Sequence, residues 1–431
     1  MGTSFTVGIA PADGEVIAEF PFDLMDGGEY VVMATGLLGD ETTPFDLAAT
    51  ATTFGADAGN VGLEVYHGST DAPAVDVLAD GAVLLSNLAY GSFSGYTQVP
   101  AADYVIGVAP TGGESIADFS ASLSGLGGGS AVVFASGFLA GGADDPAFGL
   151  FAALNDGTVL ALPTYVPTSH VQVVHNSASP TVDVYVDGAL AVEDFTYRSA
   201  TPVLELGTSF TVGIAPADGE VIAEFPFDLM DGGEYVVMAT GLLGDETTPF
   251  DLAATATTFG ADAGNVGLEV YHGSTDAPAV DVLADGAVLL SNLAYGSFSG
   301  YTQVPAADYV IGVAPTGGES IADFSASLSG LGGGSAVVFA SGFLAGGADD
   351  PAFGLFAALN DGTVLELASV GCTDVAACNY NENATVECQG NNSCCEYPDE
   401  GYDCDGNCDE GYEEDCNCLL YTSDAADEYS G

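Results

Sequence analysis

Apolar and small polar residues alternate along most of this chain, in short runs that end at glycine, proline or aspartate. In VDVYVDG (182–188), valines alternate with Asp183, Tyr185 and Asp187. A period of two with one apolar face is the pattern of a half-buried strand. The Asp-Gly pair that ends the run offers the left-handed backbone conformations of a tight hairpin turn. Asp80-Gly81 and Asp285-Gly286 repeat this pattern.

Similar runs follow one another at short intervals. The strongest are YVIGVAP (104–110), SAVVFASGFL (130–139), FTVGIAP (210–216), EVIAEFPFDL (220–229) and EYVVMATGLL (234–243). Several such strands in about 100 residues are typical of an immunoglobulin-like sandwich. The pattern therefore predicts an all-β fold of tandem antiparallel β-sandwich modules.

The chain repeats itself at two levels. Residues 2–160 are identical to residues 207–365, which indicates either a very recent duplication or an assembly error in the underlying sequence. Within this long repeat lies a shorter, degenerate one with two types of module. We call residues 61–162 and 266–367 the type-one modules and residues 168–260 the type-two module. Residues 1–60 match only the second half of the type-two module, and we call them the half-module.

The predicted organisation follows from these repeats: a half-module at 1–60, sandwich modules at 61–162, 168–260 and 266–367, a cysteine-rich segment at 371–417, and a non-native tail at 418–431. Because the chain begins in the middle of a module, we expect it to be a fragment of a longer protein whose export signal lies upstream. The final residues, CLLYTSDAADEYSG, resemble the translated read-through of a sequencing adapter.

The charge balance excludes several classes of function. The chain has 62 Asp and Glu, Arg198 as its single Lys or Arg, and a net charge of −61. Nucleic acids and anionic membrane surfaces bind cationic patches, so neither is an expected partner. A phosphate-binding P-loop or a Schiff-base enzyme needs a lysine, which this chain lacks. No apolar run reaches the roughly 18 residues of a membrane helix.

One motif carries a family resemblance. The string H-x-S-x-D-A-P-A-V-D-V begins at His67, an Asp-Gly pair follows, and PAADYVIGVAP (100–110) comes next. This arrangement resembles the bacterial family called domain of unknown function 4397, over residues 61–367. The type-two module departs from it, because His175 is followed by SASPTVDV. The resemblance implies extracellular β-domains of secreted or surface proteins, often in tandem, without an established activity.

The recurring histidine has two interpretations. In the functional one, His67, Asp71 and Asp76 form a metal or acid–base cluster. In the structural one, the histidine closes the loop after a strand, and we favour it because each module has one histidine at this motif position whereas metal sites need three or four ligands. The histidines are His67, His175 and His272. Asp71 and Asp276 would then hold a turn, and Asp76, Asp183 and Asp281 would face solvent.

The cysteine-rich segment resembles the G-C-T-D-x-x-A-C-N-Y repeats of exported marine bacterial proteins. A segment with so few core residues needs cross-links, and oxidised cysteines fit an exported protein. The disulfide candidates are Cys372, Cys378, Cys388, Cys394, Cys395, Cys404, Cys408 and Cys416. Eight cysteines allow 105 pairings, so the connectivity stays open. Zinc is disfavoured, since the segment has no histidine and no paired C-x2-C spacing.

Calcium is the one cofactor that the sequence suggests. Asp403, Asp405, Asn407 and Asp409 place oxygen ligands at every second residue, as calcium loops do, although the glycine and the bidentate glutamate of an EF-hand are missing. Loop aromatics are candidates for a sugar platform: Tyr90, Phe93 and Tyr96, with their copies Tyr295, Phe298 and Tyr301.

Together these features predict a non-enzymatic structural or adhesive array of an exported or cell-surface protein, with no catalytic residue. Other surface proteins or glycans are the expected partners. The alternative is a set of calcium- or glycan-binding extracellular modules.

Overall fold

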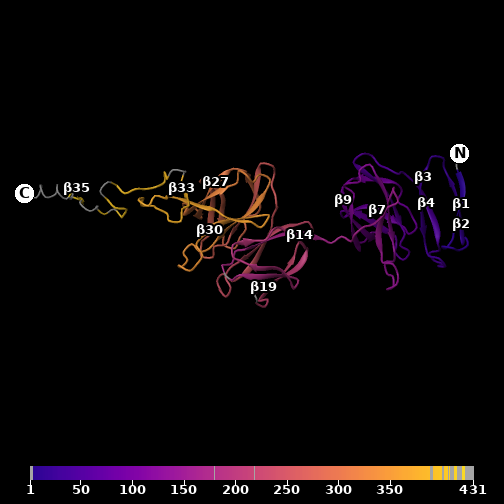
Figure 1. The fold of residues 1–431 in the computed structure, drawn as a ribbon, viewed down its shortest axis with the longest axis horizontal. Coiled ribbons are helices and arrows are strands. Elements are labelled where there is room, and N and C mark those ends of the chain that lie inside the picture. The colour runs from indigo at the N-terminus through magenta and orange to yellow at the C-terminus, as the bar shows by residue number, and fades with distance from the viewer. Residues whose placement is uncertain are drawn as a thin grey trace, which may run out of the picture. The chain divides into compact units, whose positions relative to one another are not determined.

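Figure 1 shows the computed structural model of the chain, which describes residues 3–178, 180–217, 219–388, 392–399, 402–405, 407, 412–414 and 420–422. The regular elements in this part are all strands, which confirms the predicted all-β class. None of the described residues belongs to a helix that could span a bilayer. The chain divides into two compact units, Met1–Val166 and Pro167–Gly431, and each is described by itself.

The first type-one module is a sandwich of two sheets. Its strands are β5 (Asn60–His67), β6 (Val75–Ala79), β7 (Ala82–Leu88), β8 (Thr97–Pro100), β9 (Asp103–Pro110), β10 (Ala117–Ser122), β11 (Ser130–Ser136), β12 (Gly149–Leu154) and β13 (Val159–Ala161). Four strands pair in the order β10-β9-β6-β7, and five pair in the order β13-β12-β11-β5-β8. Val65, Val77 and Ile106 are among the residues that the two sheets bury between them.

The type-two module repeats this plan in the second unit. Its strands are β14 (Thr168–His175), β15 (Val182–Val186), β16 (Ala189–Phe195), β17 (Ser199–Ala200), β18 (Leu204–Gly207), β19 (Ser209–Pro216), β20 (Ala223–Asp228), β21 (Glu234–Thr240) and β22 (Asp251–Ala256). One sheet has the order β16-β15-β19-β20. The other has the order β17-β14-β21-β22, with β18 also paired to β14.

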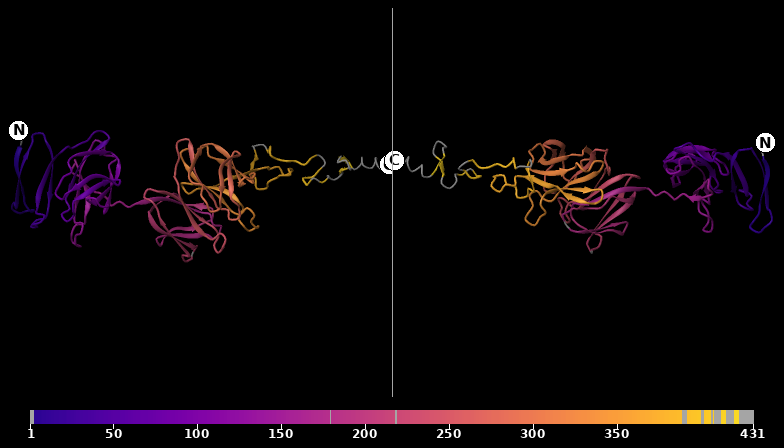
Figure 2. Two further views of the ribbon diagram at one scale, coloured as in Figure 1. Left: turned by 180° about the vertical axis from the view of Figure 1, so that it is seen from behind. Right: turned by 45° about the horizontal axis from the view of Figure 1, so that its top comes forward.

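The second type-one module extends into the cysteine-rich segment. Its strands are β23 (Asn265–His272), β24 (Val280–Ala284), β25 (Ala287–Leu293), β26 (Thr302–Pro305), β27 (Asp308–Pro315), β28 (Ala322–Ser327), β29 (Ser335–Ser341), β30 (Gly354–Leu359) and β31 (Val364–Glu366). Two further strands, β32 (Ala368–Gly371) and β33 (Val386–Glu387), lengthen one sheet to β25-β24-β27-β28-β32-β33, seen from two directions in Figure 2. A short hairpin of β34 (Tyr412–Glu414) and β35 (Leu420–Thr422) lies beyond them.

In every complete module the first strand pairs in parallel with a later strand of the same sheet, a feature that the alternating pattern did not predict. The pairs are β5 with β11, β14 with β21, and β23 with β29. In the first type-one module, for example, the chain visits the four-stranded sheet twice between β5 and β11. On its first return, as β8, the chain runs antiparallel to β5. On its second return, as β11, it runs parallel to β5.

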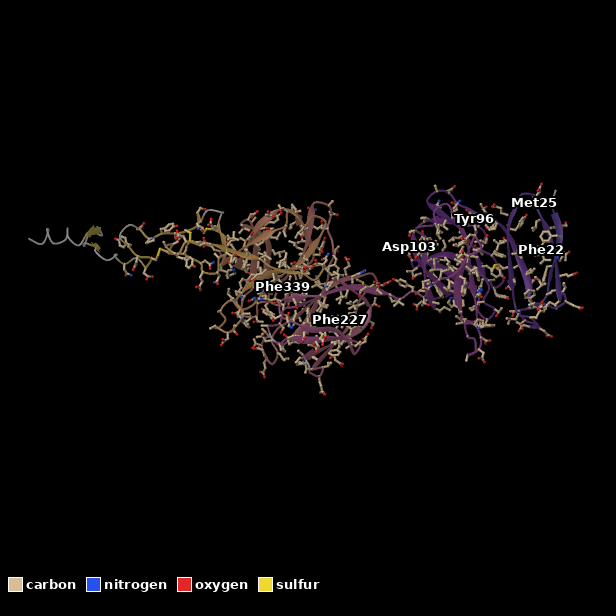
Figure 3. The ribbon with its side chains drawn as sticks, in the orientation of Figure 1. Phe22, Met25, Tyr96, Asp103, Phe227 and Phe339 are labelled. Atoms are coloured by element: carbon tan, nitrogen blue, oxygen red, sulfur yellow. A yellow bond between two sulfur atoms is a disulfide. The ribbon has the colours of Figure 1, made fainter. Side chains whose placement is uncertain are left out.

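The half-module consists of two separate hairpins. They are formed by β1 (Thr3–Ile9) with β2 (Ala18–Leu24), and by β3 (Glu29–Thr35) with β4 (Asp46–Thr52). Their sequences are those of β19 to β22. Figure 3 labels Phe22 and Met25 on the first hairpin and on the connection that follows it.

The Asp-Gly turns form as predicted. Asp80 and Gly81 have φ of 48° and 77°, and the equivalent pairs at 187–188 and 285–286 have nearly the same values. Two consecutive left-handed residues match the twist of the flanking strands in a two-residue hairpin.

Candidate functional site

The recurring histidine lies at the end of the first strand of each complete module. His67 is buried, and its Nε2–H donates to the carbonyl of Pro73 at 2.9 Å. His175 donates in the same way to Pro180, at 3.1 Å, and His272 to Pro278, at 2.9 Å. A carbonyl oxygen only accepts hydrogen bonds, so the contact assigns the proton to Nε2. The imidazole therefore holds the loop after the strand, as the structural interpretation predicted.

Burial favours the neutral form of His175 and His272. Desolvation lowers the pKa of His175 and of His272, and the carbonyl partners Pro180 and Pro278 oppose this effect only in part. A neutral, buried ring whose N–H is already bound to a carbonyl is a structural group.

The carboxylate of Asp71 connects its own loop to a second loop. Its Oδ1 and Oδ2 accept the backbone N–H groups of Leu139 and Ala140, both at 2.8 Å. Partial desolvation opposes its ionisation, but these two hydrogen bonds outweigh that effect and lower its pKa. The neighbouring Ser69 donates to the carbonyl of Gly137 at 2.8 Å. The loops that follow the parallel strands β5 and β11 are therefore fastened to each other.

Asp76 corrects one expectation, because it does not face solvent. Its side chain is buried, and its carboxylate accepts the N–H groups of Asn87 at 2.7 Å and Gly112 at 2.8 Å. These bonds, with Gly112 first, lower its pKa. Asn87 has a φ of 54°, at a register shift between β6 and β7, so the carboxylate holds a bulge that the sequence pattern did not reveal. Asp183 and Asp281 are buried in the same place of their modules.

The three groups of the functional interpretation thus bind separate backbone groups. Within the part of the chain that the structure describes, no cluster of three or more His, Cys, Asp or Glu side chains could hold a metal ion. The hydrogen bonds that His67, Asp71 and Asp76 make hold loops and the bulge.

The loop aromatics are packed against neighbouring side chains and backbone groups. Phe93 packs on Tyr66 with ring centroids 4.6 Å apart, and the Tyr96 hydroxyl donates to Gly55 O at 2.6 Å. Tyr90 meets the His67 ring edge-on at 6.1 Å. The copies Tyr295, Phe298 and Tyr301 make the same kinds of contact. All six are half-buried, so they do not form a flat exposed platform.

The cysteine-rich segment is held by three disulfides. They join Cys372 to Cys395, Cys378 to Cys404, and Cys388 to Cys394. Cys408 and Cys416 lie outside the described residues. Because β32 pairs with β28, and β33 with β32, the cross-linked segment begins as an extension of the last sandwich.

The proposed calcium ligands lie partly in one turn. The Asp403 carboxylate accepts the backbone N–H groups of Asp405 at 3.0 Å and Asn407 at 2.8 Å, and Asp403 N–H donates to the carbonyl of Asn407. Asp405 and Asn407 are exposed, and Asp409 lies outside the described residues. Calcium binding here stays a prediction.

A junction between modules is the feature that sequence reasoning missed. In the second unit, the type-two module packs its five-stranded sheet on that of the following type-one module. Val174, Val236 and Met238 meet Tyr271 and Phe339 in one buried cluster. Figure 3 labels Phe339 at this place.

Arg198, the single cation of the chain, joins this junction. Its Nη2 donates to Ala352 O at 2.7 Å and its Nε to Ser341 Oγ at 3.1 Å. The guanidinium also lies over the Phe356 ring, 4.2 Å from the centroid. Gln172 adds a bond to Leu359 O at 2.6 Å. A lone cation in a chain of charge −61 was the one signal by which the sequence could have indicated this position.

The comparison with protein families follows the same modules. The model of the family described as "Domain of unknown function (DUF4397)" matches residues 61–148, 169–281 and 266–349. The chain belongs to this family. The matched segments cover most of the three complete sandwiches, including the histidine of each.

Other comparisons add little. No curated protein matches the chain. Among solved structures, the Bacillus anthracis TIE protein is similar at 11% identity and a TM-score of 0.15, over 78% of this chain and 67% of that protein's chain. A likeness at that level carries no argument about fold or function.

Proposed function

We propose that the chain is a non-enzymatic structural or adhesive array of an exported or cell-surface protein. The observation that carries the proposal is the junction in the second unit. Successive modules there share a buried apolar cluster and bind each other through Arg198 and Gln172. Such a contact makes two sandwiches one stiff body, which suits a stalk or spacer.

The polar groups of the family motif support a non-enzymatic role. His67, Asp71 and Asp76 each have hydrogen-bond partners that close a loop or hold a bulge. Export is supported by the three disulfides, because disulfides persist in oxidising compartments. The excess of carboxylates suits an environment rich in screening cations.

Force spectroscopy on the full chain tests the structural role. Each complete module should unfold as one event and release roughly 340 Å of chain, since about 100 residues extend by 3.3–3.6 Å each. We expect three such events, with the type-two module and its neighbour rupturing at higher force in the parent chain than in Arg198→Ala. Extension without resolved unfolding events would contradict a structural array that resists force.

Calcium binding by the tail is the second candidate function. Asp403, Asp405 and Asn407 share one exposed turn, in which the Asp403 carboxylate accepts two backbone N–H groups. Titration calorimetry with CaCl2 should show heat that Asp403→Asn and Asp405→Asn abolish together. Equal heat in the parent chain and this double variant would place calcium elsewhere.

A further inference from the structure

The two type-one modules enclose an apolar cavity between their sheets. Its volume is about 220 Å³ in the first copy and about 480 Å³ in the second. The type-two module, with the same strand plan, retains only about 30 Å³. Protein interiors are otherwise close-packed, so a space of this size in one type of module and not in the other has a specific cause.

Three lining positions differ in side-chain size between the two types of module. Leu88 on β7, Ala121 on β10 and Ala131 on β11 line the cavity of the first type-one module. In the second copy the same positions are Leu293, Ala326 and Ala336, which also line the cavity.

The type-two module has an aromatic ring at each of these positions. Strand register equates Leu88 with Phe195, since they pair with Val75 and Val182, the first valines of the two Val-Asp-Val runs. It equates Ala121 with Phe227 and Ala131 with Tyr235 in the same way. Phe195 and Tyr235 are buried in the type-two core, and Phe227 packs against it.

The cavity runs to the edge of the sandwich. Its lining includes Ser120 to Leu123 on one sheet and Leu160 to Pro163 on the segment that leaves the other sheet. Ser120 N–H donates to Pro163 O at 2.9 Å, so this segment crosses the rim from one sheet to the other. In the second copy, Ala368 on β32 and Val386 on β33 also line the cavity.

We propose that each type-one module binds one neutral apolar molecule, an alkyl chain or a small hydrocarbon ring, in this cavity. An apolar cavity of about 150 Å³ in another protein stays dry and takes up benzene, and these cavities are larger. Burying an alkyl group releases about 0.8 kcal/mol for each CH2 removed from water.

Charge decides between neutral and anionic ligands. The chain has no lysine, and Arg198 is bound in the junction of the type-two module. An anionic head group would find no cation at the rim and would enter the field of a chain of charge −61. Fatty alcohols and hydrocarbons are therefore preferred over carboxylates of the same length.

The motif histidine adds a polar group to the cavity wall. His67 and His272 line the two cavities, and the Nδ1 of each is a buried acceptor with no hydrogen-bond partner among the described residues. In the type-two module, Ser177 N–H donates to the equivalent Nδ1 at 3.3 Å. A single hydroxyl on the ligand suits an unsatisfied acceptor of this kind.

Fluorescence titration of the full chain with N-phenyl-1-naphthylamine, a neutral apolar probe, tests the proposal. We expect saturable enhancement at two sites per chain, displaced at least tenfold more effectively by 1-octanol than by octanoate. Ala121→Phe with Ala131→Tyr should remove one site, and adding Ala326→Phe with Ala336→Tyr should remove both. Ala82→Phe with Ala287→Phe, at exposed positions of β7 and β25, is the matched control and should retain both sites.

Three results would overturn the proposal: no saturable binding to the parent chain, two sites retained in the folded four-residue variant, or displacement by octanoate as effective as by octanol. Circular dichroism checks the fold of each variant. If the four-residue variant does not fold, Ala121→Leu with Ala326→Leu replaces it. That variant should weaken probe binding at least fivefold, and unchanged binding would equally refute the proposal.

Discussion

Residues 3–52 and 208–257 have the same sequence, yet the structure buries them differently. Phe5 is 44% exposed whereas its copy Phe210 is 6% exposed, and Val32 is 45% exposed whereas Val237 is 2% exposed. In the type-two module, β14 to β18 supply Val171, among other residues, to cover this face. Among the described residues, β1 to β4 pair only with one another and no such strands cover them. Burial of these side chains is therefore decided by their partner strands, not by the local pattern.

The opposite face of β3, the strand that contains Val32, is covered. Val31, the neighbour of Val32, is 9% exposed, and its copy Val236 is fully buried in the module junction. The Thr35 hydroxyl lies 3.4 Å from that of Tyr90 in the following module. The half-module thus buries its junction face while its core face stays open, so the two faces depend on different partners.

Completing the half-module should have the largest effect. A copy of residues 168–206 placed directly ahead of Gly2 would supply the missing strands and cover the core face. We expect the thiol of Val32→Cys to react with a maleimide about a thousandfold more slowly in the extended chain, because reaction then requires opening of the module. The ratio of the labelling rate in the extended chain to the labelling rate in the parent chain measures the change.

Met25→Cys is the control for this extension. Met25 is 74% exposed and its copy Met230 is 70% exposed, so its labelling should not change. If Val32→Cys stays equally reactive after the extension, the partner strands are not what buries this face.

The same substitution in the two copies should have unequal consequences. Phe210→Ala removes a buried ring and should lower the free energy of unfolding of the type-two module by about 3–5 kcal/mol. Phe5→Ala should cost less than about 1 kcal/mol, as at other exposed positions. Urea denaturation of both variants measures the difference. Equal losses would show that the half-module has a closed core in solution.

Removing Arg198 should loosen the junction in the second unit. Arg198→Ala removes a cation–π contact and two hydrogen bonds that a charged group donates. Together these changes should lower the free energy of unfolding by about 2 kcal/mol. Calorimetry should then resolve the type-two module from its neighbour as separate transitions. Arg198→Lys should recover only part of the loss, since an ammonium cannot reproduce the planar fork. A single unchanged transition in Arg198→Ala would contradict a role in coupling.

The smallest effect concerns Tyr271, at the same junction. Burial raises the pKa of Tyr271 to about 12. A raised pKa in the folded state favours the neutral phenol. The stability that Tyr271 contributes is therefore complete below pH 10 and is lost as the pH rises through 12. Between these pH values the free energy of unfolding of the parent chain should fall by about 2 kcal/mol, and that of Tyr271→Phe should not show this loss. Denaturation midpoints at pH 8 and pH 11.5 test this, and parallel losses in both chains would refute it.

The sequence predicted much of the fold because the signals were local. The Asp-Gly pair at 80–81 and its two copies form the hairpin turns that such pairs favour, with positive φ at both residues. The alternation of VDVYVDG predicted β15, and the histidine at the end of β5 closes its loop. The burial of Asp76 could not be predicted, because its carboxylate binds Asn87 and Gly112, which lie far along the chain.

The order of the amino acids was enough to predict where strands and turns form, how often the module recurs, and which cysteines are available for cross-links. Strands and turns depend on the alternation of apolar and polar residues and on turn residues, which act within a few positions. The repeat and the cysteines are visible directly in the sequence. The three-dimensional fold was needed to show which strands pair in parallel, which face of β3 or β21 is covered, and where Arg198 binds. Those outcomes depend on contacts between distant segments, so identical residues such as Phe5 and Phe210 have different surroundings.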